Sequence, residues 1–142
     1  MKTMIRDSDE SRQFFLSKGH PPVADRTICV DFDQTLYPYG ELYGDQEPLP
    51  GAVAAMQQFR DAGLKIVIFT SRLSPVWWSA EGWDHSEAER LQRVYITSKL
   101  NHDGIPFDKL TGEKIPAIAY IDDKAVEFKN NWAEVAERVA RL

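Results

Sequence analysis

The chain has 142 residues, of which 43% are hydrophobic and 27% are charged, and its formal net charge is -5 at pH 7. This length is too short for two ordinary domains, and the composition excludes a disordered chain. No apolar run reaches the roughly 20 residues that span a bilayer. The net negative charge argues against nonspecific binding of nucleic acid. We therefore expect a single soluble domain over residues 1–142 that has no membrane partner.

Two features of the sequence bear on the cellular compartment. Residues 1–15 are rich in charge and contain no apolar segment of signal-peptide length. Cys29 is the one cysteine, so no internal disulfide can form, and its apolar neighbours indicate a buried side chain. We expect a cytoplasmic protein.

A short helix is the first predicted element. Ser8 can cap a helix over residues 9–18, and Gly19 can end it. We interpret residues 1–25 as a helical appendage without a function of its own. Residues 26–142 then form the core of the domain.

An apolar, β-branched run over residues 26–30 predicts a buried strand that ends in Asp31 and Asp33. Side chains alternate along a strand, so these two carboxylates point the same way if the strand continues regularly. Such a pair can hold a hard cation and can do nucleophilic or acid-base work. The alternative for an isolated pair is a strand that stops at an acidic turn.

A loop, a helix and a second strand are expected next. Residues 38–50 are rich in Gly, Pro and acids and form a loop too short for a lid domain. Apolar residues at helical spacing predict a helix over residues 50–62, and residues 65–70 predict a second buried strand. A right-handed crossover of this length brings the two strand ends together, so we expect Thr70 to face Asp31.

Residues 73–83 predict an irregular loop with an unusual aromatic load: Trp77, Trp78 and Trp83. One interpretation is an aromatic platform for substrate at the mouth of the site. The other is hydrophobic cover for the core or an oligomer contact. We favour packing, because tryptophans more often pack than bind.

The spacing of Asp84 and Glu87 predicts a capped second crossover helix that ends before Gly104. Residues 105–110 then suggest a short strand or an extended turn, and residues 111–116 a loop.

A further buried strand is predicted over residues 117–121, and it ends in Asp122 and Asp123. A brief edge strand at 126–128 and a terminal helix capped by Asn131 complete the chain. The helix has an apolar face of Trp132, Val135, Ala136 and Val139.

Polar residues therefore follow each main strand. They are Asp31 and Asp33, then Thr70, Ser71 and Arg72, then Asp122 and Asp123, with Lys114 in the loop before the last strand. The carboxyl ends of parallel strands line one crevice, where ligands of such folds bind.

This arrangement resembles the haloacid dehalogenase (HAD) superfamily of phosphohydrolases. Residues 31–36, DFDQTL, look like its first motif, residues 66–70 like its second, Lys114 like its third and residues 120–123 like its fourth. The order and separations agree from about Arg26 to the C-terminus. Residues 115–128 look most like small capless members from bacteria and their phages. The resemblance implies a three-layer, Rossmann-like α/β fold with a central, mostly parallel sheet flanked by helices, and no large cap domain.

The resemblance also implies a Mg²⁺-dependent phosphatase that acts through an aspartyl-phosphate on an unidentified phosphomonoester. Asp31 would be the nucleophile, and Asp33 the general acid and then the general base. Asp31, the backbone carbonyl of Asp33 and Asp122 would hold the ion. Asp123 would bind it through water or orient Lys114.

The remaining predicted residues would bind the phosphoryl group. Thr70 would donate a hydrogen bond to a phosphoryl oxygen, with Ser71 beside it, and Lys114 would neutralise charge. Arg72 would add a bidentate contact. Gln34 departs from the family pattern, because many relatives carry glycine or another small residue there, and this bears on the shape of the pocket.

Other functions compete with this interpretation. A response-regulator receiver domain places its acidic pair first and its phosphorylated aspartate later, the reverse of this chain. A non-catalytic, regulatory phosphate-binding relative is a second alternative, against which Asp33 argues. A phosphotransferase or a nucleic-acid-end phosphatase is a third. The open crevice is compatible with small-molecule, protein or nucleic-acid phosphates, of which the net acidity disfavours nucleic acid. The sequence leaves the oligomeric state open.

Overall fold

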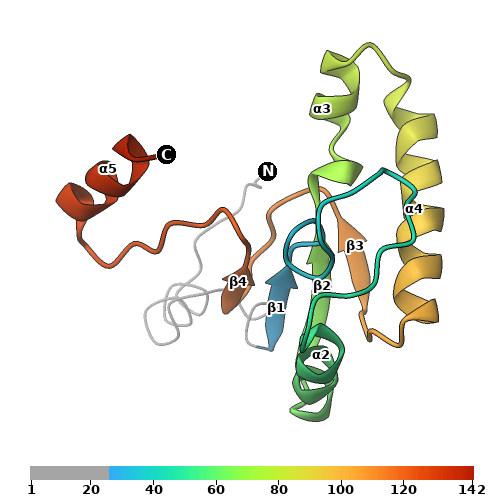
Figure 1. The fold of residues 1–142 in the computed structure, drawn as a ribbon, viewed down its shortest axis with the longest axis horizontal. Coiled ribbons are helices and arrows are strands. Elements are labelled where there is room, and N and C mark those ends of the chain that lie inside the picture. The colour runs from blue at the N-terminus through green and yellow to red at the C-terminus, as the bar shows by residue number, and fades with distance from the viewer. Residues whose placement is uncertain (1–25) are drawn as a thin grey trace, which may run out of the picture.

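The computed structural model describes residues 26–142, so the predicted helix over residues 9–18 lies outside the described part. Four parallel strands form the centre of the fold (Figure 1). They are β1 (Thr27–Val30), β2 (Lys65–Phe69), β3 (Lys109–Thr111) and β4 (Ala119–Ile121), in the spatial order β3-β2-β1-β4. Every pairing is parallel, which confirms the predicted α/β class.

The two central strands are apolar because both of their faces are covered. All four residues of β1 are buried, as are the three middle residues of β2. Parallel strands inside a sheet typically show such continuous apolar runs. Ile28 pairs with Ile66 and Val30 with Ile68, so these four side chains share one face of the sheet.

Two helices connect the first three strands and pack on that face. α2 (Ala52–Asp61) contributes Met56 to the core, and α4 (His85–His102) contributes Ile96 and Leu100. The Asp84 carboxylate accepts hydrogen bonds from the amides of Ser86 and Glu87 at the start of α4, which confirms the predicted cap. Both crossovers bring strand ends to one edge, as predicted.

The segment after β2 is more regular than predicted. Residues 71–83 contain a 3₁₀ helix, η2 (Ser71–Leu73), and α3 (Pro75–Ala80), whereas the sequence predicted an irregular loop over residues 73–83. Ser74 caps α3 by accepting a hydrogen bond from the Trp77 amide, and Pro75 occupies its first turn. A helix this short is under two turns long, so its sequence carries no apolar periodicity that could reveal it.

The C-terminal part of the fold differs most from expectation. The residues of β4 are exposed, and α5 (Trp132–Ala140) projects away from the sheet (Figure 1). α5 forms where predicted, but none of its residues is buried, and Trp132 is 72% exposed. The predicted edge strand at 126–128 has no strand structure. Among the described helices, none has both the length and the apolarity that crossing a membrane requires.

Candidate active site

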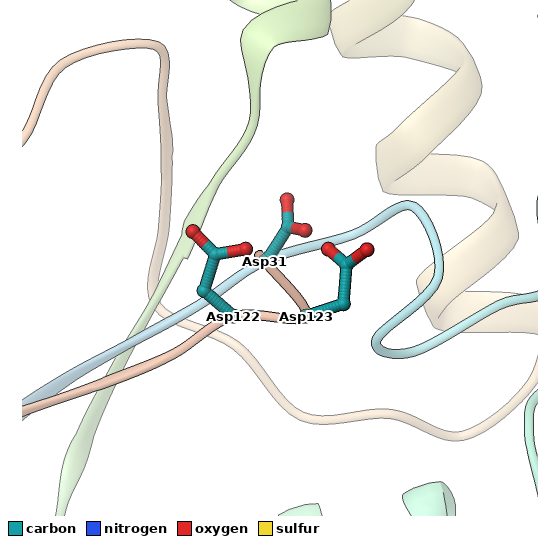
Figure 2. A group of neighbouring side chains, drawn as sticks. All are labelled: Asp31, Asp122 and Asp123. Atoms are coloured by element: carbon teal, nitrogen blue, oxygen red, sulfur yellow. The ribbon is translucent and has the colours of Figure 1, made fainter. Parts of the chain in front are cut away.

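The acids of the first and fourth predicted motifs meet where β1 and β4 end. Val30 pairs with Ile121, and the Asp31 amide donates a hydrogen bond to the Ile121 carbonyl at 2.9 Å. Asp31 therefore lies beside Asp122 and Asp123, and Figure 2 shows the three carboxylates gathered at this edge. One carboxylate oxygen from each lies within 4.8 Å of the others.

Neighbouring groups hold these carboxylates in place. The Thr35 hydroxyl donates a hydrogen bond to Oδ2 of Asp31 at 3.3 Å. The backbone amide of Lys124 donates one to Oδ1 of Asp122 at 3.0 Å, and the Lys124 ammonium lies 3.3 Å from Asp123. The acidic cluster is thus built from two adjacent strand ends and the turn that follows each.

The electrostatics of the cluster favour a bound cation. Burial raises the pKa of Asp31 to about 7, and the hydrogen bond with Asp123 and the charges of Asp122 and Asp123 act in the same direction. Burial alone would also raise the pKa of Asp123, but hydrogen bonds with Asp31 and Lys124 lower it below its usual value. Near pH 7, Asp31 is therefore protonated about half of the time. A hard divalent cation such as Mg²⁺, which prefers carboxylate oxygens, suits this donor set and would replace that proton.

A cavity of about 580 Å³ opens beside the cluster. It is lined by the four acids Asp31, Asp33, Asp122 and Asp123, by Gln34, Ser71, Ser74, Gly112 and Lys124, and by the aromatic side chains of Tyr39 and Phe69. Tyr39 is 75% exposed, so the cavity has an open aromatic rim. The space is large enough for a phosphate ester.

Asp33 lines the same cavity but has a different environment. Its carboxylate accepts two hydrogen bonds from Arg72, from Nε to Oδ2 at 2.9 Å and from Nη2 to Oδ1 at 2.8 Å. The two aspartates of the DFD sequence therefore have different surroundings: Asp31 lies among acids and Asp33 against a guanidinium.

Three residues predicted to bind the phosphoryl group do not line the cavity in this structure. Thr70 is 1% exposed, and its hydroxyl oxygen accepts a hydrogen bond from the Arg72 amide at 3.2 Å. Arg72 is buried against Asp33. The ammonium of Lys114 lies 4.8 Å from the centre of the Tyr120 ring. Of the predicted phosphoryl-binding residues, Ser71 is the one at the cavity wall.

Lys124 lines the cavity and was missed by the sequence reasoning. Its position directly after Asp123 was the available signal, because the turn that follows a strand's carboxyl end tends to stay at the site. Lys114 remains a predicted phosphoryl ligand on the strength of the motif alone.

The tryptophans are not a platform for the cavity, since none of the three lines it. Trp78 is buried, and its indole Nε1 donates a hydrogen bond to the Arg72 carbonyl at 2.7 Å. Trp77 and Trp83 pack against it with ring centres 4.5 and 6.4 Å away. The packing interpretation fits Trp78, which supports the 3₁₀ turn that carries Arg72.

Gln34, the predicted departure from the family pattern, has a φ of 61°. This is the left-handed region, which glycine adopts freely and which other residues rarely enter. The Gln34 amide donates a hydrogen bond to the Tyr37 carbonyl at 2.6 Å, which closes the turn between the two residues. A glycine in relatives would meet this backbone requirement without strain.

The structure thus defines an α/β protein with an acidic cluster at the carboxyl edge of a parallel sheet. Three solved structures share features of this fold. A structural-genomics target protein from Vibrio cholerae is 21% identical with a TM-score of 0.51, over 80% of this chain and 98% of that one. A conserved protein from Bacteroides thetaiotaomicron is 21% identical with a TM-score of 0.44, over 81% and 89% of the two chains.

The third is the D,D-heptose 1.7-bisphosphate phosphatase from B. bronchiseptica, solved with magnesium and phosphate. It is 19% identical with a TM-score of 0.40, over 81% of this chain and 64% of that one. No family model and no curated protein matches the sequence. At 21% identity, the likeness to the Vibrio cholerae protein concerns the fold alone, and it agrees with the α/β class that the strand pairings show.

Proposed function

We propose that this protein is a Mg²⁺-dependent phosphohydrolase of the HAD type that hydrolyses a phosphomonoester through an aspartyl-phosphate on Asp31. The observation that carries the proposal is the convergence of Asp31, Asp122 and Asp123 within 4.8 Å, beside Asp33, on the wall of one cavity. The clustered carboxylates are expected to bind a divalent cation, and the neighbouring Asp33 carboxylate is expected to transfer a proton.

The reaction has two displacements. A carboxylate oxygen of Asp31 attacks phosphorus, the bond from phosphorus to the ester oxygen breaks, and Asp33 gives its proton to the leaving oxygen. Asp33 then takes a proton from a water molecule that attacks phosphorus, the bond from phosphorus to the Asp31 oxygen breaks, and phosphate leaves while Asp31 is restored as a carboxylate. Mg²⁺ would be held by Asp31, Asp122 and the Asp33 carbonyl, with Asp123 beside them, and would offset the charge of carboxylates and phosphate.

A cation from the protein completes the charge balance on the phosphoryl group. The motif assigns this role to Lys114, and the cavity offers Lys124, whose ammonium lies 3.3 Å from Asp123. Thr70 and Ser71 would bind phosphoryl oxygens from the end of β2, Ser71 from its place on the cavity wall. Measuring Lys114→Ala and Lys124→Ala in one assay tests this: the lysine whose substitution lowers activity more has the role.

The substrate class follows from charge and access. Four acids line the cavity against one lysine, and the chain is acidic as a whole. Such a surface disfavours a polyanionic substrate. We propose a phosphorylated small molecule or protein as substrate in preference to a nucleic-acid end.

The test is a hydrolysis screen with the full chain and Mg²⁺. The panel contains p-nitrophenyl phosphate, sugar phosphates, phosphopeptides and oligonucleotides with terminal phosphates. We expect turnover that Asp31→Asn lowers at least about a thousand-fold, because the nucleophile is lost. Asp61→Asn, which changes an exposed acid on α2, is the matched control. Wild-type activity in Asp31→Asn would contradict the covalent mechanism, and phosphate binding without turnover in the wild type would favour the regulatory alternative.

A further inference from the structure

Arg72 is a buried cation whose hydrogen bonds all lie within the protein. Its side chain is 6% exposed, and its Nε and Nη2 bind the two oxygens of Asp33. Its third nitrogen, Nη1, donates hydrogen bonds to Oε1 of Gln92 at 3.2 Å and to the Leu42 carbonyl. Each guanidinium nitrogen thus has a partner in the protein, and Arg72 does not line the cavity.

Aromatic side chains and the backbone hold the guanidinium from the other directions. Its central carbon lies 5.1 Å from the centre of the Phe32 ring and 5.7 Å from that of Tyr95. Cations near aromatic rings at such distances are stabilised by the ring quadrupole. The Arg72 carbonyl accepts the indole hydrogen bond of Trp78 at 2.7 Å, which anchors the backbone as well. Both ends of the residue are therefore fixed.

Gln92 shows how specific this arrangement is. It is completely buried on α4, its Oε1 faces Arg72, and its Nε2 has no hydrogen-bond partner in the described part of the chain. An unmet buried donor costs stability. The opposite amide orientation would turn Nε2 toward a guanidinium that has no acceptor to offer. The contact with Arg72 thus determines the orientation of the Gln92 side-chain amide.

We propose that Arg72 is a positioning residue for Asp33, and not a ligand of the phosphoryl group as the sequence suggested. Its two parallel hydrogen bonds remove the rotation of the Asp33 carboxylate and hold it at the cavity wall. Proton transfer requires the acid within about 2.6 to 3.2 Å of the leaving oxygen, so a loose carboxylate works poorly. This role rests on the proposed function.

Two phosphate esters with different leaving groups can distinguish whether Arg72 positions Asp33 or binds the phosphoryl group. An alkyl phosphate such as glycerol 2-phosphate expels a strongly basic alkoxide that needs a proton, whereas p-nitrophenyl phosphate expels a weakly basic phenolate that needs it much less. Arg72→Met should lower kcat/KM for glycerol 2-phosphate about 100-fold and for p-nitrophenyl phosphate less than about 10-fold. Arg72→Lys, which keeps a charge and a donor, should recover part of the loss. Inhibition by inorganic phosphate should stay unchanged in both variants.

A double-mutant cycle tests the link to Asp33. In the Asp33→Asn background, Arg72→Met should lower kcat/KM for glycerol 2-phosphate less than about threefold, because the group it positions is already disabled. Arg90→Met, an exposed arginine of α4 paired with Glu87, is the matched control and should leave the rate unchanged. Gln92→Met, which removes the acceptor for Arg72 at similar volume, should give a smaller loss with the same dependence on leaving group. It also keeps the test valid if Arg72→Met fails to fold.

The outcomes separate the two proposals. No wild-type turnover of either ester would overturn the proposed function and this role with it. Wild-type turnover with equal losses for both esters, losses additive with Asp33→Asn, or weaker inhibition by phosphate in Arg72→Met would overturn the positioning role alone.

Discussion

Asp31 and Asp33 are two residues apart and carry the same side chain, yet tertiary contacts give them opposite surroundings. Asp31 faces the carboxylates of Asp122 and Asp123, while Asp33 faces the guanidinium of Arg72. The acidic neighbours of Asp31 favour the binding of a cation. In the proposed mechanism, the bound cation keeps the Asp31 nucleophile in its charged form. The Arg72 guanidinium holds the Asp33 carboxylate in one orientation. The division of labour in the proposed mechanism follows from these neighbours.

Asp31 should make the metal-free protein less stable as the pH rises. Its pKa of about 7 in the folded state exceeds the ordinary value of 3.8, so between these values the folded chain holds a proton that the unfolded chain releases. Stability therefore falls as the pH rises through this range. In EDTA, Asp31→Asn should be more stable than the wild type by about 1 kcal/mol at pH 8, a figure reduced for the partial solvent exposure of Asp31, and nearly equal to it at pH 4.

Thermal unfolding at the two pH values measures this difference. Asp61→Asn serves again as the control, because its carboxylate is exposed on α2 and its effect should not change with pH in this way. An equal effect of Asp31→Asn at pH 4 and pH 8 would contradict the prediction.

Among the elements, α4 and α5 show how differently two amphipathic helices are used. α4 has 18 residues and buries Ala88, Gln92, Ile96 and Leu100, four positions at regular helical spacing. α5 has nine residues and buries none of them in the described structure. Helices shorter than about 12 to 15 residues are marginal in water without packing.

The amides of α5 should therefore exchange with solvent much faster than those of α4. Hydrogen-deuterium exchange read by mass spectrometry is the measurement, and we expect protection in the centre of α4 to exceed that in α5 at least about a hundredfold. Equal protection in the two helices would contradict the prediction and would mean that another surface covers the apolar face of α5.

For the whole molecule, the proposed metal site would link folding to the binding of Mg²⁺. A ligand that binds only the folded state stabilises it by about 2.7 kcal/mol at a concentration of 100 Kd. Mg²⁺ should thus raise the Tm by several degrees, more at neutral pH than at pH 5, where protons compete for Asp31.

Differential scanning fluorimetry with and without Mg²⁺ tests this. Asp122→Asn should abolish most of the shift by removing a ligand, whereas Asp61→Asn should retain it. A Tm shift that is equal in Asp122→Asn and in the wild type would place the ion elsewhere.

The parallel sheet and its acidic edge could be predicted from sequence because local patterns encode them. The apolar runs of β1 and β2 read as buried strands, and Asp31, Asp122 and Asp123 follow strands whose ends a crossover must bring together. Thr70 was also expected at that edge, and β2 does carry it there. Periodicity and strand order thus determined the location of the acidic cluster.

Only the tertiary structure decided what each polar group contacts. Arg72 follows Thr70 by two residues in the chain, but its partners are Asp33 and Gln92, which are 39 and 20 residues away. Lys124 reaches the cavity and Lys114 does not, although the motif favoured the latter. Strand position is a property of the local chain, whereas a side chain's partner depends on the packing of elements distant in sequence. For that reason the acidic cluster could be located from the sequence, while the partner of Asp33 could not.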